Sequence, residues 1–116
     1  MLFLVVPDGT EGGFAMKETI GGKMFNTETA TCVACYQYSE PRDVMYYREE
    51  LYRKKTGEYF LYCKGGGLSP YRLYTPENSW VGREEIQPMT LDEAKEWAEE
   101  HLDAEDYVTV FGEPEE

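Results

Sequence analysis

The chain has 116 residues, with 11 Lys and Arg side chains against 23 Asp and Glu, which gives a formal net charge of −12. This length allows one domain, and a hydrophobic content of 41% with ten tyrosines is too high for a chain disordered throughout. A pI near 4.5 disfavours binding to nucleic-acid phosphates or anionic membranes through bulk charge, because the net charge of the chain repels both.

The first six residues are apolar, but this run is too short for a signal peptide or a membrane span and leads directly into a turn at Pro7, Asp8 and Gly9. Its length and β-branched content are typical of a short buried strand. We therefore expect a cytoplasmic chain that does not enter a membrane. Five glycines follow, so residues 7–22 are predicted to form a loop.

Three cysteines, Cys32, Cys35 and Cys63, cannot all pair, and an odd number fits free thiols in a reducing compartment. Cys32 and Cys35 form a CxxC motif, a spacing found in zinc and redox sites. However, residues 29–38 alternate as a strand does, which predicts that these two side chains point to opposite faces. The Val-Ala pair between them also lacks the tight turn of a zinc knuckle. We expect buried free thiols, no metal site and no cofactor.

Residues 44–63 contain the strongest strand pattern in the sequence. Two aromatic-rich segments, residues 44–54 and 59–63, flank a connection at residues 55–58 that contains Gly57, and this arrangement predicts a β-hairpin. The other predicted extended segments are residues 23–27, 30–38 and 84–87.

A helix is predicted to begin after Thr90, because Thr90 and Glu93 have the spacing of a capping box. Over about 13 residues, one helical arc is mainly apolar and the opposite arc is acidic. The residues of the first arc are Leu91, Ala94, Trp97, Ala98, His101 and Leu102. Asp103 can cap a second helix that ends at Gly112, with Tyr107, Val110 and Phe111 facing inward, although residues 108–110 also suit a strand.

These segments predict one α+β domain over residues 1–112. Its core is a small, mainly antiparallel sheet around a central β-hairpin, packed by a C-terminal amphipathic helix through Leu91, Trp97, Ala98 and Leu102, with a second short helix. The predicted parts are a strand and Gly-rich loop (1–22), a sheet region (23–87), a helical end (90–111) and an acidic tail (113–116).

The negative charge is concentrated at the C-terminal end. Residues 1–91 carry 10 basic and 12 acidic side chains, whereas residues 92–116 carry Lys95 alone against 11 acids. Such a helix face is either merely solvated or a ridge for a basic protein surface, since successive carboxylates along it resemble the phosphates of a nucleic-acid strand. The candidate partner-binding residues are Asp92, Glu93, Glu96, Glu99, Glu100, Asp103, Glu105 and Asp106.

The predicted hairpin offers an alternative site. Basic and aromatic side chains alternate along it, as they do in sheets that bind single-stranded nucleic acid, but they also occur in ordinary sheet packing. The candidate residues are Arg48, Tyr52, Arg53, Lys54, Lys55 and Tyr59. The same basic face could instead receive the acidic helix of a second copy, in a homo-oligomeric structural or adaptor domain.

Catalytic motifs are not evident. The single histidine, His101, lies at the end of the predicted helix, where a partly buried structural histidine is the ordinary explanation. No nucleophile motif or paired-carboxylate site accompanies it in the sequence. We therefore expect a non-enzymatic protein.

Three segments together resemble a known group of proteins. They are residues 22–30 (GKMFNTETA), residues 50–62 (ELYRKKTGEYFLY) with the glycine triplet that follows, and residues 91–107 (LDEAKEWAEEHLDAEDY) leading to Phe111 and Gly112. Their order over roughly residues 20–112 is similar to that of short acidic proteins carried on phages and conjugative elements of Gram-positive bacteria. The chain departs from that family in residues 1–21 and at its cysteines. The resemblance implies an inhibitor of a host defence nuclease, of the anti-CRISPR or anti-restriction type, by analogy.

Overall fold

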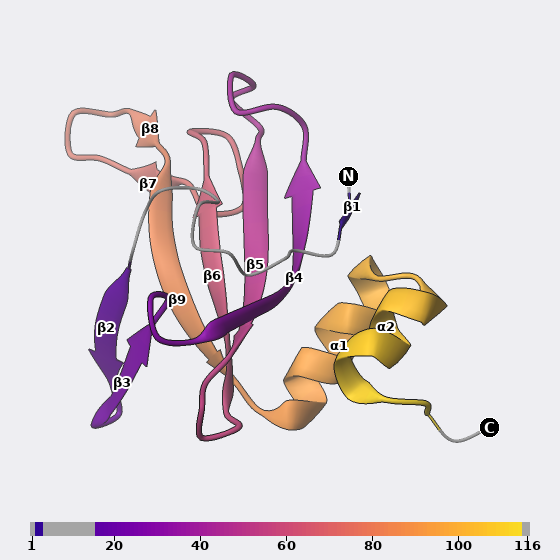
Figure 1. Ribbon diagram of the computed structural model, residues 1–116. Coiled ribbons are helices and arrows are strands. Elements are labelled where there is room, and N and C mark those ends of the chain that lie inside the picture. Colours follow the sequence, from indigo (N-terminus) through magenta and orange to yellow (C-terminus); the bar gives the residue numbers. More distant parts are fainter. Residues whose placement is uncertain (1, 4–15, 115–116) are drawn as a thin grey trace.

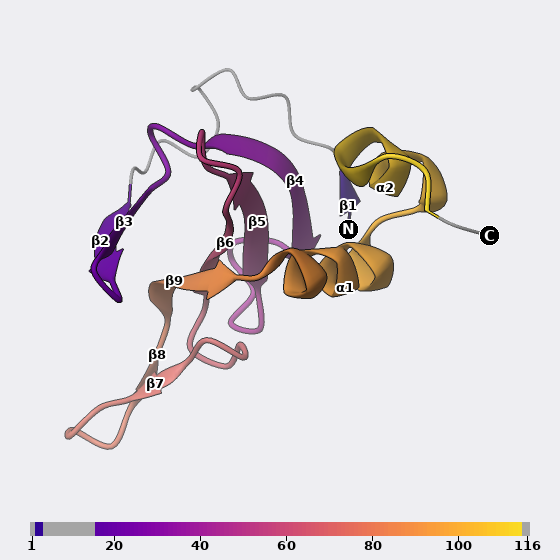
Figure 2. The ribbon, with the colours of Figure 1, turned by 90° about the horizontal axis from the view of Figure 1, so that it is seen from below.

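The computed structural model describes residues 2–3 and 16–114 and confirms the α+β class. An antiparallel five-stranded sheet, in the order β1-β4-β5-β6-β9, has two helices against one face and a small hairpin against the other (Figures 1 and 2). The sheet strands are β1 (Leu2–Phe3), β4 (Thr31–Tyr38), β5 (Tyr47–Arg53), β6 (Tyr59–Gly65) and β9 (Arg83–Met89). The other elements are β2 (Lys17–Ile20), β3 (Lys23–Asn26), β7 (Leu73–Tyr74), β8 (Trp80–Val81), α1 (Leu91–His101) and α2 (Ala104–Phe111).

The predicted central hairpin is present as β5 and β6. Arg53 lies opposite Tyr59, and the turn is closed by the Lys54 N–H, which donates to the Glu58 carbonyl at 2.7 Å. Gly57 has φ +95°, a left-handed conformation that glycine adopts without a Cβ clash. The turn therefore follows from the glycine that the sequence places there.

Alternation along β5 and β6 gives the sheet two apolar faces. Leu51 and Leu61 face the helices and pack with Trp97, whereas Phe60 faces the β2–β3 hairpin and packs edge-on against Phe25 at 5.6 Å between ring centroids. Burying both faces requires cover on both sides, which is why the molecule has three layers (Figure 2).

The first predicted helix is α1, and its capping box is formed: the Thr90 hydroxyl accepts from the Glu93 N–H, and the Glu93 carboxylate accepts from the Thr90 N–H. Ala94, Trp97 and Ala98 are buried, as predicted. Leu91 was expected to pack inward, and this is wrong, because it is 50% exposed. It lies in the first turn, at an open groove of about 490 Å³ beside the β5–β6 turn.

The second predicted helix is α2, so the strand alternative for residues 108–110 is wrong. The Asp103 carboxylate caps it by accepting from the Asp106 N–H at 2.8 Å, and Gly112 with φ +85° ends it. As predicted, Tyr107, Val110 and Phe111 pack against the core. The caps at Asp103 and Gly112 therefore favour a helix over a strand in this segment.

The predicted loop at residues 7–22 is wrong over its last part. Residues 17–20 form β2, which pairs with β3 through a turn at Gly21 and Gly22, both at positive φ. The glycines therefore allow a tight turn between two short strands, where we expected a loop. Residues 7–15 of the predicted loop lie outside the described residues. Of the predicted first strand, residues 2–3 form β1, and the rest also lies outside the described residues.

The expectation that Cys32 and Cys35 point to opposite faces is also wrong. Cys32 pairs with Tyr52 and Cys35 with Glu50, two residues on the same face of β5, because a bulge between Cys32 and Ala34 adds one residue to β4. All three cysteines are free and buried.

The region after β6 contains more strand structure than predicted. The strand expected at residues 84–87 extends over all of β9, and β7 and β8 form a further small hairpin before it. Gly82 allows this connection, since a Cβ there would lie 2.1 Å from the Gly65 carbonyl oxygen.

Candidate protein-binding surface

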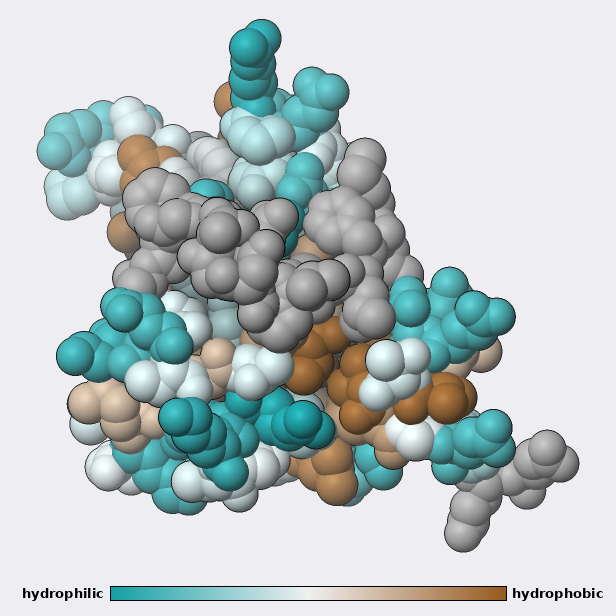
Figure 3. Space-filling view, viewed as in Figure 1, coloured by the Kyte–Doolittle hydropathy of each residue, from teal (hydrophilic) through white to brown (hydrophobic). Residues whose placement is uncertain are grey.

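The outward faces of α1 and α2 form an acidic ridge. Seven of its eight predicted carboxylates are exposed, and Asp106 is half-buried. The ridge residues are Asp92, Glu93, Glu96, Glu99, Glu100, Asp103, Glu105 and Asp106. In Figure 3 hydrophilic side chains lie along the outer edge of the helix pair, beside a hydrophobic area. The structure therefore brings all the predicted partner-binding residues to one end of the molecule.

The helical repeat explains this grouping. Ala94, Trp97 and Ala98 recur at spacings of three and four and fix the buried side of α1. Glu96 and Glu100 fall on the opposite side, where they reach water. The apolar positions thus determine where the acidic ones point.

Two ridge residues cap the helices. The Glu93 carboxylate completes the capping box of α1, and the Asp103 carboxylate caps α2. Asp92, Glu105 and Asp106 also lie in first helical turns, where negative charge is favourable. Glu96, Glu99 and Glu100 therefore remain as carboxylates with no evident role in folding.

Neighbouring carboxylates on α1 are not neutralised within the chain. Among residues 16–114, no ridge carboxylate forms an ion pair, and Lys95 is the one basic residue of the two helices apart from His101. Like charges at spacings of three and four destabilise a helix by about 0.2–0.5 kcal/mol per pair. The protein carries this cost without a compensating contact in the described part of the chain.

A largely buried carboxylate on the sheet contacts α1. Glu49 on β5 accepts a hydrogen bond from the Trp97 indole N–H at 2.7 Å and another from the Tyr71 hydroxyl. The His101 Nε2 lies 4.0 Å from Glu49, while its Nδ1 is 2.9 Å from the Trp97 carbonyl oxygen. Sequence reasoning missed Glu49, because a single acid in an alternating strand carries no sign of its partners.

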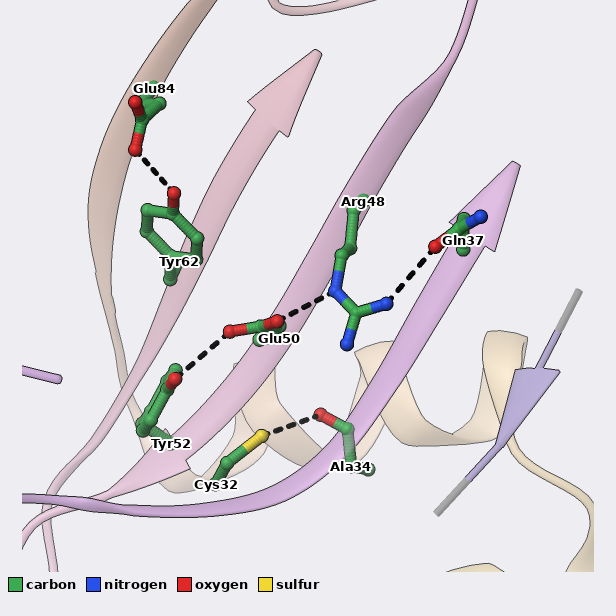
Figure 4. Close-up of polar contacts among 8 residues, drawn as sticks. All are labelled: Cys32, Ala34, Gln37, Arg48, Glu50, Tyr52, Tyr62 and Glu84. Carbon is green, nitrogen blue, oxygen red and sulfur yellow. Dashed lines mark hydrogen bonds and ion pairs between the residues drawn. The ribbon is translucent and has the colours of Figure 1, made fainter. Parts of the chain in front are cut away.

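The alternative hairpin site does not form one surface. Arg48 and Tyr52 lie on the sheet face away from the helices, where both contact Glu50 (Figure 4): the Arg48 Nε is 2.6 Å from one carboxylate oxygen and the Tyr52 hydroxyl 2.9 Å from the other. Tyr52 also stacks on Phe60. On the same face, the Tyr62 hydroxyl donates to Glu84. These polar groups are therefore engaged within the sheet.

The other four candidates of the hairpin are separated from this pair. Tyr59 is buried on the helix side against Phe111. Lys54 lies over the Phe25 ring at 4.1 Å and reaches Glu58, whereas Arg53 and Lys55 are exposed near the turn. An exposed row of aromatic and basic side chains, which single-strand binding requires, is not assembled by these six residues.

The thiols lie in a poorly reactive environment. Burial raises the pKa of both the Cys32 and the Cys63 thiol to about 12. Within the described residues, no group of three His, Cys, Asp or Glu side chains is arranged to hold a metal ion. No helix of this part of the chain is long and apolar enough to span a bilayer.

Comparison with protein-family models, with curated proteins and with solved structures gave no match to this chain.

Proposed function

We propose that this protein is a non-enzymatic inhibitor that binds a basic protein surface through its acidic ridge. The supporting observation is the row of exposed carboxylates on α1 and α2 that have no ion-pair partner among residues 16–114. A basic partner would relieve the repulsion between these carboxylates. The loss of this repulsion would then contribute to the free energy of binding.

The kind of partner follows from the spacing of the charges. Carboxylates one helical turn apart, such as Glu96 and Glu100, are separated by about 6 Å along the axis. A protein groove that binds a nucleic-acid strand presents Lys and Arg side chains to a comparable row of phosphates. The ridge is therefore suited to occupy such a groove, and the protein would act as a nucleic-acid mimic.

The resemblance to acidic proteins of mobile elements suggests a specific target. A nuclease of host defence, either a CRISPR nuclease or a restriction enzyme, has a basic groove of this kind and works in the cytoplasm. Inhibition by occupation of the groove needs no catalytic residue in the inhibitor. This target is an analogy to the family and is the most specific part of the proposal.

The test is affinity capture with three versions of the full chain as bait. The ridge variant carries Glu96→Lys and Glu100→Lys, which leave both capping carboxylates, Glu93 and Asp103, in place. The control variant carries the same change in charge at Glu28 and Glu40, which are exposed and belong to the connections after β3 and after β4. Baits are incubated with a lysate of a Gram-positive host, and bound proteins are identified by mass spectrometry.

We expect the original chain and the control variant to retain the same nucleic-acid-binding protein, and the ridge variant to lose it. Added salt should release the partner, because charge contacts are screened over about 8 Å at physiological ionic strength. Equal capture by all three baits would refute a role for the ridge. Direct binding of single-stranded DNA in a gel shift, lost on changing Arg53 and Lys55, would favour the alternative nucleic-acid-binding regulator.

A further inference from the structure

The β7–β8 hairpin projects from the sheet at the end away from the helices (Figures 1 and 2). Its strand residues, Leu73, Tyr74, Trp80 and Val81, are between 40% and 51% exposed. Leu73 lies opposite Val81, and Tyr74 lies opposite Trp80. Since successive side chains point to opposite faces, both faces of this hairpin are apolar. A ribbon that remains in water normally has at least one polar face.

The apolar surface continues onto neighbouring loops. Leu68 is 51% exposed, and its N–H donates to the Val44 carbonyl at 2.8 Å. Gly67 lies close to the Trp80 backbone, since a Cβ at position 67 would come within 3.0 Å of the Trp80 carbonyl oxygen. We call this surface the hairpin patch. Its members are Val44, Met45, Leu68, Leu73, Tyr74, Trp80 and Val81, and hydrophobic surface is visible beside the hairpin in Figure 3.

Contacts within the β7–β8 hairpin fix its conformation. The Thr75 N–H donates to the Ser79 carbonyl at 2.7 Å, and the Tyr74 hydroxyl donates to the Asn78 side chain at 2.6 Å. The Tyr74 and Trp80 rings are 4.8 Å apart, and the Arg72 guanidinium lies over the Trp80 ring. Trp, Tyr and Arg are the residues that most often dominate binding energy at protein interfaces, and a preformed loop loses little entropy on binding.

The charges along the hairpin are complementary to those of a second copy. Arg72 lies at its root and Glu77 at its tip, and within residues 16–114 neither forms an ion pair. A twofold axis that packs two hairpins side by side in opposite directions places each tip beside the root of the other. Each Glu77 then faces an Arg72, and this pairing occurs twice because the contact is symmetric.

We propose that the hairpin patch mediates homodimerisation, in which two β7–β8 hairpins pack antiparallel through the face that carries Tyr74 and Trp80. The position of the acidic ridge fits this arrangement. Because the ridge lies at the other end of the molecule, dimerisation keeps the two strongly acidic ends apart and both ridges open (Figure 1). The patch consists of few side chains, so we expect a weak dimer with a micromolar dissociation constant.

The first test is sedimentation equilibrium of the full chain over a range of concentrations. We expect the mass to rise from 13.4 kDa towards twice that value. Trp80→Ser should weaken the dimer at least tenfold. Met24→Ser serves as the matched control, since Met24 is also 50% exposed but lies on β3, and it should leave the dimer unchanged. Far-ultraviolet circular dichroism checks that each variant folds.

A charge swap tests the antiparallel packing independently of Trp80. Arg72→Glu alone and Glu77→Arg alone should each weaken the dimer, and the two changes together should restore it. A constant mass of one chain at all concentrations would overturn the proposal, and so would a double variant no stronger than the single ones. Loss of the dimer in the Glu96→Lys, Glu100→Lys variant would also overturn it, because that result would place the acidic helix in the interface.

Discussion

Glu49 is the side chain that ties the helical layer to the sheet. Its carboxylate is largely buried and accepts from Trp97 on α1 and from Tyr71 in the loop after β6. Trp97 and Tyr71, which lie far from Glu49 in the sequence, therefore share one carboxylate as their hydrogen-bond acceptor. Nothing local to Glu49 signals this, since the partners are set by how β5 lies against α1.

Replacing Glu49 should be costly. In Glu49→Ala the Trp97 and Tyr71 donors lose a charged acceptor, and hydrogen bonds to charged groups are worth about 1.5–3 kcal/mol each. We expect urea unfolding to show a loss of roughly 2–4 kcal/mol. Glu28→Ala, at an exposed position, is the control and should change stability by less than about 0.5 kcal/mol. A similar small change at both positions would contradict the anchoring role.

The thiols offer a second prediction at this scale. Burial raises the pKa of Cys32 and Cys63 to about 12, and the thiolate is the reactive form. At pH 8 we expect the folded chain to react with Ellman's reagent at least about a hundredfold more slowly than the chain in urea. Equal rates in the two states would show that these side chains are open to solvent.

At the scale of elements, a surface cluster of charges joins the β2–β3 hairpin to the β5–β6 turn. Glu58 lies 2.8 Å from Lys23 and 3.3 Å from Lys54. The hydrogen bond from Lys23 is the largest cause that lowers the pKa of Glu58 from its ordinary 4.5 to about 2, followed by that from Thr56. The cluster stabilises the folded form only while Glu58 is ionised.

This lowered pKa predicts a pH dependence. The stabilisation is complete above pH 4.5 and is lost as the pH falls through about 2. We therefore expect the original chain to have a higher urea midpoint than Glu58→Gln at pH 7, and the two midpoints to converge towards pH 2. The difference should be small and should shrink with salt, because the side chains are exposed. A difference that persists at pH 2 would contradict this explanation.

Local signals predicted the elements that depend on local chemistry. The capping residues Thr90 and Asp103, together with Gly112, placed both helices, and Gly57 placed the central turn. Features set by pairing were missed. The bulge in β4, which puts Cys32 and Cys35 on one face, depends on its register with β5.

The same division applies to the candidate site. Helical periodicity predicted that the acidic residues of α1 lie opposite its apolar ones, because burial of Trp97 determines which side of the helix reaches water. The hairpin candidates were grouped by composition alone, and strand alternation sent Tyr52 and Tyr59 to opposite faces. Exposed Tyr74 and Trp80 went unnoticed, because their exposure depends on how far the β7–β8 hairpin projects.

The whole molecule has two different ends. The acidic ridge lies at the helical end and the apolar hairpin patch at the opposite end (Figure 1). A net charge of −12 is thus a local property of one end, and the sheet between the two ends is nearly neutral. If both proposals hold, a dimer would present two acidic ridges facing away from each other, and could engage two partner molecules.

Competition with DNA tests the central proposal most directly. The protein captured by the ridge is purified and bound to a fluorescent DNA substrate, and the full chain is then added while fluorescence anisotropy is followed. We expect the chain to displace the DNA, the Glu28→Lys, Glu40→Lys control to do so equally, and the Glu96→Lys, Glu100→Lys variant to need at least about a tenfold higher concentration. A stable complex that holds the chain and the DNA together would contradict nucleic-acid mimicry by the acidic ridge.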